Sequence, residues 1–208
     1  MSNLIENLPS AWVVQIKQDG MTKADLRQKY KEMRLQLSPG EIERLSEQIV
    51  EQALTHFQLS EKTVSLFLPI ERQREINTYL LLERATGIGA AVAVPKTNFE
   101  TMEMRHYLFE STDQLEVNLK GIPEPKKGKV VAADRFDIVF VPLLAADSKG
   151  NRVGYGKGFY DRFLRKCSPG CLFIGLHYFD IEKKIDDVLP TDIRLNALVM
   201  PTRVLRFD

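Results

Sequence analysis

The sequence predicts one three-layer, Rossmann-like α/β domain whose sheet is largely parallel and covered by helices on both faces. Segments with strand and helix patterns alternate along the whole chain, an order typical of a parallel sheet. Residues 136–142 are almost continuously apolar, as expected for a strand that is covered on both sides. The 208 residues contain no repeat, low-complexity segment or linker, so we expect a single domain.

The composition narrows the range of partners and locations. Apolar residues make up 44% and charged residues 27% of the chain, ordinary values for a soluble globular protein. The formal net charge is +1, so bulk charge gives no reason to expect nucleic acid or an anionic membrane as a partner. No apolar run reaches the length of a membrane span or a signal sequence. The default location is therefore the cytoplasm. A monomer is expected as well, although the sequence itself carries no signal for the oligomeric state.

The first residues and the two cysteines are predicted to lie apart from any site. Residues 1–20 are expected to form an N-terminal extension, and residues 21–208 the domain. Cys167 and Cys171 lie four positions apart without a secretory context, and are expected to be reduced thiols. A zinc site is not expected, because no second pair of ligands lies near them in the sequence.

The first predicted helix follows Met21. Its apolar side chains recur on one stripe, at Leu26, Tyr30, Met33 and Leu37. Lys23 and Arg27 are four positions apart, so both cations project from the same face of this helix. On the helical pattern alone, a solvated basic face is the favoured interpretation of these two residues.

A second helix is predicted to start at Ser38, with Pro39 in its first turn and Glu41 closing a capping box. Its apolar stripe comprises Ile42, Leu45, Ile49, Ala53 and Phe57. A third helix, capped by Thr78, is predicted to end at Gly87. The other expected elements are strands over residues 63–68, 90–95, 102–109, 136–142, 171–176 and 197–200, a loop over 120–129, and a helix to about 166.

A glycine-rich stretch, residues 150–164, follows the apolar strand. Three glycines alternate in it: Gly154, Gly156 and Gly158. Such a backbone can adopt positive φ and approach a ligand closely, and its N–H groups can bind phosphate oxygens. Arg152 and Lys157 add positive charge to the same loop. The loop leads into a helical pattern beyond a strand's carboxyl end, where ligands bind in parallel sheets.

The spacing of this loop excludes two familiar phosphate-binding motifs. No Gly-Lys-Ser/Thr follows, as a Walker A motif requires, and G-x-G-x-G differs from the dinucleotide fingerprint. On the glycines alone, a tight structural loop with buried aromatic side chains is the alternative. The full pattern over residues 152–164 is Arg-x-Gly-x-Gly-x-Gly-aromatic-Tyr-Asp-Arg-x-Leu. It resembles the signature of the 5-formyltetrahydrofolate cyclo-ligase family, also called methenyltetrahydrofolate synthetase.

The resemblance extends over nearly the whole chain, from about Met21 to Met200. Lys23 and Arg27 are similar to the family's Lys-x-x-x-Arg start. Further similar segments are residues 68–78, which resemble a strand end followed by Glu-x-x-Thr, residues 121–125, which resemble a Gly-Ile-x-Glu-Pro loop, and residues 137–142, which resemble the strand feeding the site.

The resemblance implies an ATP-dependent enzyme that converts 5-formyltetrahydrofolate to 5,10-methenyltetrahydrofolate. ADP and phosphate would be released, through a phosphorylated formyl intermediate, with Lys157 and Arg152 as catalytic residues. The implied ATP site comprises Lys23, Arg27, Arg152, Val153, Gly154, Tyr155, Gly156, Lys157, Gly158, Phe159 and Tyr160. The implied folate site comprises Ile70, Glu75, Tyr155, Gly156, Lys157, Gly158 and Phe159.

Two carboxylate roles are also implied by the resemblance. Glu75 would hydrogen-bond the pterin ring, the alternative being a surface loop acid. Asp161 matches the family's magnesium-binding aspartate, the alternative being a first-turn acid that interacts with the helix dipole. The second Mg²⁺ ligand falls on Glu182, and Asp180 or Asp186 could serve instead, because this segment differs from the family's.

Two other functions stay open on the sequence. A non-catalytic folate- or nucleotide-binding paralogue could share the scaffold, but it would have little use for a complete phosphoryl-transfer set. That set comprises Lys23, Arg27, Arg152, Lys157 and Asp161. A sugar-phosphate isomerase-like enzyme would have a similar fold and need no ATP. Incubation with 5-formyltetrahydrofolate, with and without ATP, would distinguish the three functions.

Overall fold

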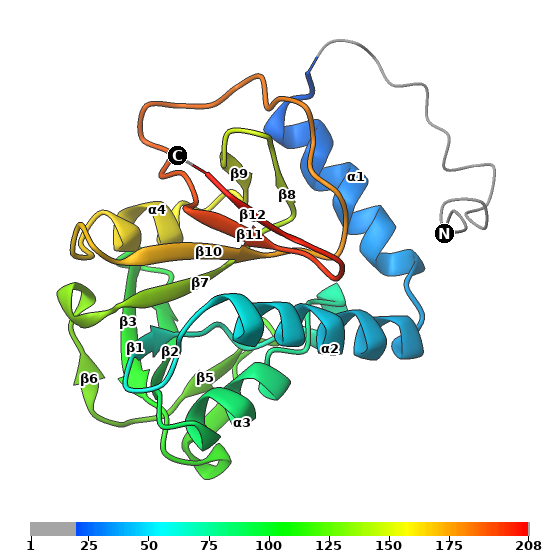
Figure 1. Ribbon diagram of the computed structural model, residues 1–208. Helices are drawn as coiled ribbons and strands as arrows, with labels where there is room; N and C mark the ends of the chain where they lie inside the picture. The colour runs from blue at the N-terminus through cyan, green and yellow to red at the C-terminus, as the bar shows by residue number, and fades with distance from the viewer. Residues whose placement is uncertain (1–19, 208) are drawn as a thin grey trace.

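The computed structural model describes residues 20–207, which fold around one eight-stranded sheet (Figure 1). The strand order is β12-β11-β10-β7-β1-β2-β3-β6. The five strands from β11 to β2 run parallel, whereas β12, β3 and β6 are antiparallel to their neighbours. The strands are β1 (Thr63–Ser65), β2 (Ala91–Asn98), β3 (Glu103–Leu108), β6 (Val130–Val131), β7 (Ile138–Pro142), β10 (Leu172–Leu176), β11 (Ala197–Val199) and β12 (Val204–Arg206).

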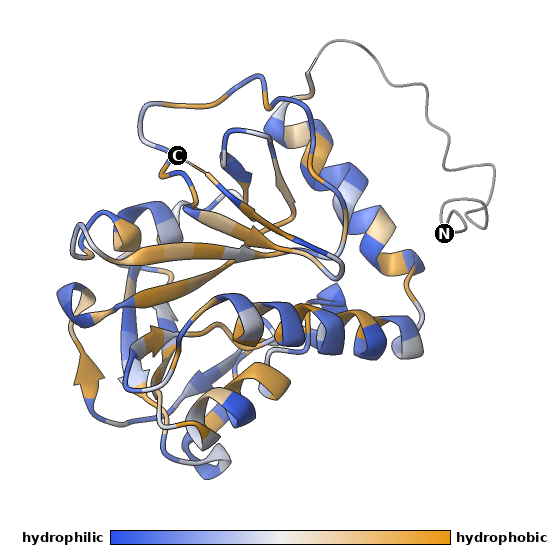
Figure 2. Cartoon of the chain, in the orientation of Figure 1, coloured by the Kyte–Doolittle hydropathy of each residue, from blue (hydrophilic) through white to orange (hydrophobic). Residues whose placement is uncertain are grey.

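The predicted fold class is confirmed by this largely parallel sheet and by the helices that cover both of its faces. α2 (Pro39–His56) and α3 (Tyr79–Gly87) lie on one face, and α4 (Phe159–Leu164) lies on the other (Figure 1). The central strands are predominantly hydrophobic, whereas α2 alternates between apolar and polar positions (Figure 2). Of the expected N-terminal extension, residues 1–19 lie outside the described residues.

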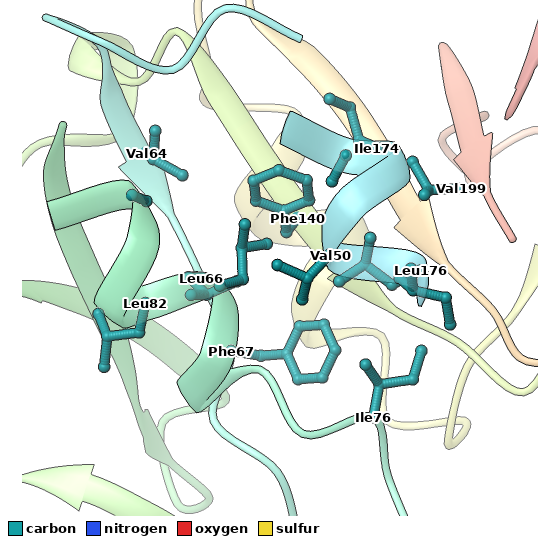
Figure 3. Close-up of a cluster of buried hydrophobic side chains, with 14 of the residues drawn as sticks. Val50, Val64, Leu66, Phe67, Ile76, Leu82, Phe140, Ile174, Leu176 and Val199 are labelled. Atoms are coloured by element: carbon teal, nitrogen blue, oxygen red, sulfur yellow. The ribbon is translucent and has the colours of Figure 1, made fainter. Parts of the chain in front are cut away.

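The core beneath α2 and α3 is formed by aliphatic and aromatic side chains from both layers. Val50 of α2 lies beside Phe140 of β7 (Figure 3), and Leu82 of α3 and Ile174 of β10 belong to the same buried cluster. On the opposite face, Phe163 of α4 belongs to a second buried cluster with residues of β7 and β11. Burial of this apolar surface on both sides holds the parallel strands, and therefore their carboxyl ends, in fixed positions.

The first helix, α1 (Lys23–Gln36), packs away from the large sheet. It lies against a small hairpin formed by β8 (Ala145–Ala146) and β9 (Arg152–Val153). Leu26 and Tyr30, two members of the predicted apolar stripe, are buried there. The hairpin itself was not predicted, and it carries the first residue of the glycine-rich pattern next to α1.

The start of α1 is attached to a segment near the C-terminus. The backbone N–H of Lys23 donates to Asp187 Oδ1 at 2.7 Å. Met21 forms a parallel bridge with Ile185, and Asp186 N donates to the carbonyl of Met21 at 3.1 Å. The helix that carries Lys23 and Arg27 is therefore positioned by residues more than 160 positions further along the chain.

The start of α2 confirms the predicted capping box, and α3 follows Thr78 as predicted, but the Thr78 side chain does not cap the helix. Ser38 Oγ accepts from Glu41 N at 3.3 Å, and Glu41 Oε2 accepts from Ser38 N at 2.7 Å. Thr78 does not accept from the helix, because its hydroxyl donates to the carbonyl of Phe67 at 2.6 Å. Thr78 thereby fastens the start of α3 to the chain just beyond β1.

Several predicted boundaries also need correction. The strand expected over residues 63–68 ends at Ser65, although Leu66 N still donates to Ala93 O at 3.0 Å. The expected loop over residues 120–129 contains β5 (Pro123–Pro125), which pairs with β4 (Leu115–Val117). The edge strand β12 was not predicted, and α4 ends at Leu164 rather than near residue 166.

Candidate active site

A cavity of ≈ 310 Å³ lies at the carboxyl ends of the parallel strands. Phe67 and Leu68, just beyond β1, line it together with Thr97 of β2 and Pro142 at the end of β7. The other walls come from α1, from the loop after β1, and from residues 152–161. The cavity therefore lies where a parallel sheet is expected to bind its ligand.

Nearly all residues predicted for the ATP and folate sites meet in this cavity. Its lining includes Lys23, Arg27, Ile70, Glu75, Arg152, Gly154, Tyr155, Gly156, Lys157, Gly158, Phe159 and Tyr160. Val153 is the exception, because it is fully buried in the cluster between α1 and the β8–β9 hairpin. The helical pattern suggested a solvated basic face for Lys23 and Arg27. The structure contradicts that interpretation, because both side chains line the cavity.

The glycine loop owes its shape to two of its three alternating glycines. Gly156 has φ +87° and Gly158 has φ +66°, a region that disfavours residues with a Cβ atom. Arg27 Nε donates to the carbonyl of Gly154 at 2.9 Å, so α1 and the loop are in direct contact. A Cβ atom on Gly156 would lie 3.2 Å from Arg27 Cζ, and the glycine therefore permits this close approach.

Asp161 and Arg152 form a partly buried ion pair at the cavity. Arg152 Nη2 donates to Asp161 Oδ1 at 2.7 Å, and Ile193 N donates to the same oxygen at 3.0 Å. Arg152 also donates to the carbonyl of Ile193. Burial lowers the pKa of Arg152, and the Asp161 carboxylate opposes that effect. The carboxylate and the guanidinium are thus held in defined orientations before any ligand arrives.

A second ion pair, between Lys23 and Asp192, lies in the same cavity. Asp192 was not predicted as a site residue. It lies in the long connection between β10 and β11, whose sequence gives no signal that Asp192 returns to the edge that carries the glycine loop. Lys157 is exposed, and no ion-pair partner for its ammonium group occurs among residues 20–207. It is therefore available to a ligand.

Glu75 is buried, which contradicts the alternative of a surface loop acid. It is 5% exposed, and its carboxylate accepts hydrogen bonds from the Tyr155 hydroxyl and, at 2.8 Å, from Ile70 N. Burial raises the pKa of Glu75, while Arg34 and these hydrogen bonds act in the opposite direction. Tyr155 belongs to the glycine loop, so both predicted loops lie at the same edge of the sheet.

The structure does not bring Glu182 to the cavity. Its carboxylate accepts from Lys29 Nζ at 2.6 Å and from Tyr30 Oη at 2.8 Å. The alternatives are no better placed, because Asp180 pairs with Arg203 and Asp186 pairs with Lys184. All three acids are therefore paired with basic side chains, and none of them lines the cavity. Asp192, six to twelve positions further on, lines the cavity instead.

The carboxylates at the cavity fit a magnesium ion that also binds phosphate. Asp161 and Asp192 both line it, and their carboxylate oxygens are hard ligands of the kind that Mg²⁺ prefers. Among residues 20–207 no group of three or more His, Cys, Asp or Glu could enclose a metal. Mg²⁺ is commonly held by one or two carboxylates together with waters and substrate phosphates, so two acids suffice.

Among residues 20–207, none of the helices has both the length and the apolar character of a membrane span.

Comparison with known proteins points to one family. The profile of the 5-formyltetrahydrofolate cyclo-ligase family matches residues 19–176. The probable 5-formyltetrahydrofolate cyclo-ligase of Schizosaccharomyces pombe is 32% identical over 161 residues, covering 70% of this chain and 78% of that protein. The corresponding Caenorhabditis elegans protein is 31% identical over 205 residues, covering 89% and 96% of the two chains.

A solved structure agrees with these sequence relatives. The structure of Aquifex aeolicus 5,10-methenyltetrahydrofolate synthetase superposes with a TM-score of 0.75 at 32% identity, covering 89% of this chain and 93% of that one. Neither the isomerase nor the non-catalytic alternative is favoured by any of these matches. The chain therefore belongs to the 5-formyltetrahydrofolate cyclo-ligase family, and it is an enzyme that forms 5,10-methenyltetrahydrofolate from 5-formyltetrahydrofolate.

Proposed function

We propose that this cyclo-ligase works by transferring the γ-phosphoryl group of ATP to the formyl oxygen of its substrate. The observation that carries the proposal is a single cavity that contains both a cation-rich glycine loop and the buried carboxylate of Glu75. That the protein works as a monomer remains a prediction. The location of the protein in the cell remains a prediction.

The chemistry requires a better leaving group at the formyl carbon. An amide-like oxygen leaves poorly, whereas phosphate leaves well. In the first step the formyl oxygen forms a bond to the γ-phosphorus as the bond from that phosphorus to ADP breaks. In the second step the neighbouring amine bonds to the formyl carbon, loses its proton, and the carbon–oxygen bond breaks to release phosphate. The net products are 5,10-methenyltetrahydrofolate, ADP and phosphate.

The cations are assigned to the phosphoryl-transfer step. Lys157 and Arg152 would neutralise the charge that develops on the transferring group, which is the main contribution a protein makes to such reactions. Lys23 and Arg27 of α1 would hold the other phosphates, and backbone N–H groups of residues 154–158, which line the cavity, would add donors. Arg152 is oriented for this role by its ion pair with Asp161.

Asp161 is proposed as a magnesium ligand, with Asp192 in place of Glu182 as the second carboxylate. Mg²⁺, when bound, lowers the negative charge on phosphate oxygens. In the ligand-free protein, Arg152 and Lys23 neutralise these two acids, so the carboxylates are not left as unpaired charges. When magnesium and ATP bind, Asp161 and Asp192 would contact the metal ion, and Arg152 and Lys23 would contact the phosphates.

The folate is assigned to Ile70, Glu75 and the glycine loop. The pterin edge offers N–H donors, and each oxygen of Glu75 already accepts only one hydrogen bond. A carboxylate has about four acceptor positions, so it can still receive N–H groups from a ligand. The folate-facing carboxylate and Lys157 line the same cavity, as transfer from ATP to the folate requires.

An oxygen-labelling experiment tests the phosphorylated intermediate. Substrate labelled with ¹⁸O in the formyl group is incubated with the purified enzyme, ATP and Mg²⁺. We expect the label in the released phosphate, because the formyl oxygen is the atom that leaves with phosphorus. A reaction without ATP is the control and should release none. Label that appears only in water would contradict transfer to the formyl oxygen.

We expect Glu75→Gln to weaken folate use while changing the ATP dependence little. A hydrogen bond to a charged group contributes roughly 1.5–3 kcal/mol, so kcat/KM for the folate should fall about tenfold or more. The measurement is initial rate against each substrate in turn. Glu71→Gln, an exposed acid in the same loop, is the matched control and should resemble the wild type. Equal losses for both substrates would contradict the assignment.

A further inference from the structure

A buried arginine links the two loops that meet at the cavity. Arg34 lies in the last turn of α1 and is 3% exposed. Its Nη1 donates to Tyr155 Oη at 3.0 Å and lies 3.9 Å from Glu75 Oε1. Its Nη2 donates to the carbonyl of Leu143, just beyond β7. Its Nε has no partner among the described residues, so the two terminal nitrogens make all of its hydrogen bonds.

These contacts join segments that are distant in the sequence. α1 supplies Arg34, the glycine loop supplies Tyr155, the loop after β1 supplies Glu75, and the chain beyond β7 supplies Leu143. Tyr155 also donates its own hydroxyl proton to Glu75, so the three side chains form a closed triangle. Tyr155 and Glu75 line the cavity, whereas Arg34 lies behind them.

Arg34 is the one positive charge that faces Glu75 among the described residues. The other titratable groups nearby are neutral. Burial raises the pKa of Tyr160 of α4, and raises that of Tyr178, beyond β10, to about 12. His177, beside Arg34, has a pKa lowered to about 3 by burial and by that arginine. Among the described residues, no cation other than Arg34 lies within ion-pair distance of Glu75.

We propose that Arg34 is a positioning residue for the cyclo-ligase reaction, whose charge favours the carboxylate form of Glu75 and whose hydrogen bonds fix Glu75 and Tyr155 in one arrangement towards the folate. This inference rests on the proposed contact between Glu75 and the pterin. A carboxylate in an apolar, buried position tends to take up a proton, and a protonated Glu75 would lose acceptor capacity for the pterin N–H groups. Arg34 therefore acts through Glu75 and touches no substrate.

An arginine suits this position better than a lysine. Its planar fork can donate to Tyr155 and to Leu143 at the same time, whereas an ammonium group is a single point charge. The positive charge and the geometry can consequently be separated by substitution. Arg34→Met removes both, and Arg34→Lys retains the charge while losing the fork.

The test is the pH dependence of kcat/KM for 5-formyltetrahydrofolate at saturating ATP. Because Arg34 opposes the effect of burial on Glu75, its removal should raise the pKa of that carboxyl further. In Arg34→Met the acidic limb of the profile should therefore move to higher pH. At neutral pH the folate kcat/KM should fall about tenfold or more, as for loss of a charged hydrogen-bond partner. KM for ATP should stay within about twofold of the wild type, because Arg34 does not line the cavity and its removal takes away no direct contact with ATP.

The lysine variant separates this role from a purely structural one. Arg34→Lys should restore the position of the acidic limb, since the charge is retained, but recover kcat/KM only in part. If Arg34→Met fails to fold, the lysine variant is compared with the wild type alone, and its limb should coincide with that of the wild type at reduced kcat/KM. Arg44→Met, an exposed arginine of α2, is the matched control and should change neither quantity.

A double-mutant cycle distinguishes failure of this inference from failure of the folate assignment. In a Glu75→Gln background, Arg34→Met should cause little further loss, because the residue it acts through no longer ionises. If the losses in folate kcat/KM of the two single variants multiply fully in the double variant, the role of Arg34 is overturned. It is also overturned if both Arg34 variants match the wild type in the pH of the acidic limb and in the value of kcat/KM. A Glu75→Gln enzyme with wild-type folate kinetics would instead overturn the proposed contact with the pterin.

Discussion

Replacing Lys157 with alanine is expected to lower kcat by about 10²–10³-fold, the usual cost of removing one donor that stabilises transition-state charge. Lys157 lies between Gly156 and Gly158, lines the cavity and is exposed, so its ammonium group is available to a phosphoryl oxygen. The fold should be unaffected, because no described ion pair depends on this side chain. Steady-state kinetics and thermal unfolding of the same preparation measure the two effects.

Lys166→Ala is the matched control for this prediction. Lys166 is also an exposed lysine, and it follows α4 rather than lining the cavity. Its removal changes the net charge by the same amount, so a general electrostatic effect would lower the activity of both variants equally. Wild-type turnover in the Lys157 variant would reject its catalytic role, and an equal loss in both variants would reject its specificity.

Replacing Asp161 with asparagine is expected to raise the magnesium concentration needed for half-maximal activity by about tenfold or more. Residues behind metal ligands already change metal affinity ten- to hundredfold, and a direct carboxylate ligand should matter at least as much. The amide oxygen can still accept from Arg152 and from Ile193 N, so the variant removes charge while it retains these contacts. Rate as a function of Mg²⁺ at fixed ATP is the measurement.

The same titration decides between the two candidates for the second ligand. Asp192→Asn should resemble Asp161→Asn, whereas Glu182→Gln should leave the magnesium requirement unchanged, because Glu182 bonds to Lys29 and Tyr30 away from the cavity. Asp134→Asn, at an exposed position, serves as the control for loss of a negative charge. If the titrations of Asp161→Asn and the wild type superimpose, Asp161 is not a magnesium ligand, and its role is limited to the ion pair with Arg152.

The sequence predicted the fold and most of the site because these depend on patterns that are local in the chain. The apolar run of β7, the capping box at Ser38 and the alternating glycines are all short-range signals. The fold class then brings the loop after β1 and the glycine loop to one edge of the sheet. That argument placed Glu75 near Gly156 although about eighty residues separate them.

The wrong predictions concern residues whose surroundings come from distant parts of the chain. Residues 120–129 have the proline and glycine content of a loop, yet Glu124 lies in a strand. Its buried carboxylate accepts from Thr97 N at 2.8 Å and from Asn118 Nδ2 at 2.9 Å, contacts that no local pattern reveals. Asp192 was missed for a similar reason, since only the tertiary structure brings it to Lys23.

The attachment of α1 to the segment around Ile185 has a consequence for the order in which the protein is built. On the ribosome, Lys23 is made early, but its partners Asp187 and Asp192 are made more than 160 residues later. α2 and the strands up to β10 can pack before that point, whereas the phosphate-binding wall, like β11 and β12, is complete only after a closure across more than 160 residues. The active site and the β11–β12 side of the sheet are therefore completed at the same late stage, and ATP cannot assist the early stages of folding.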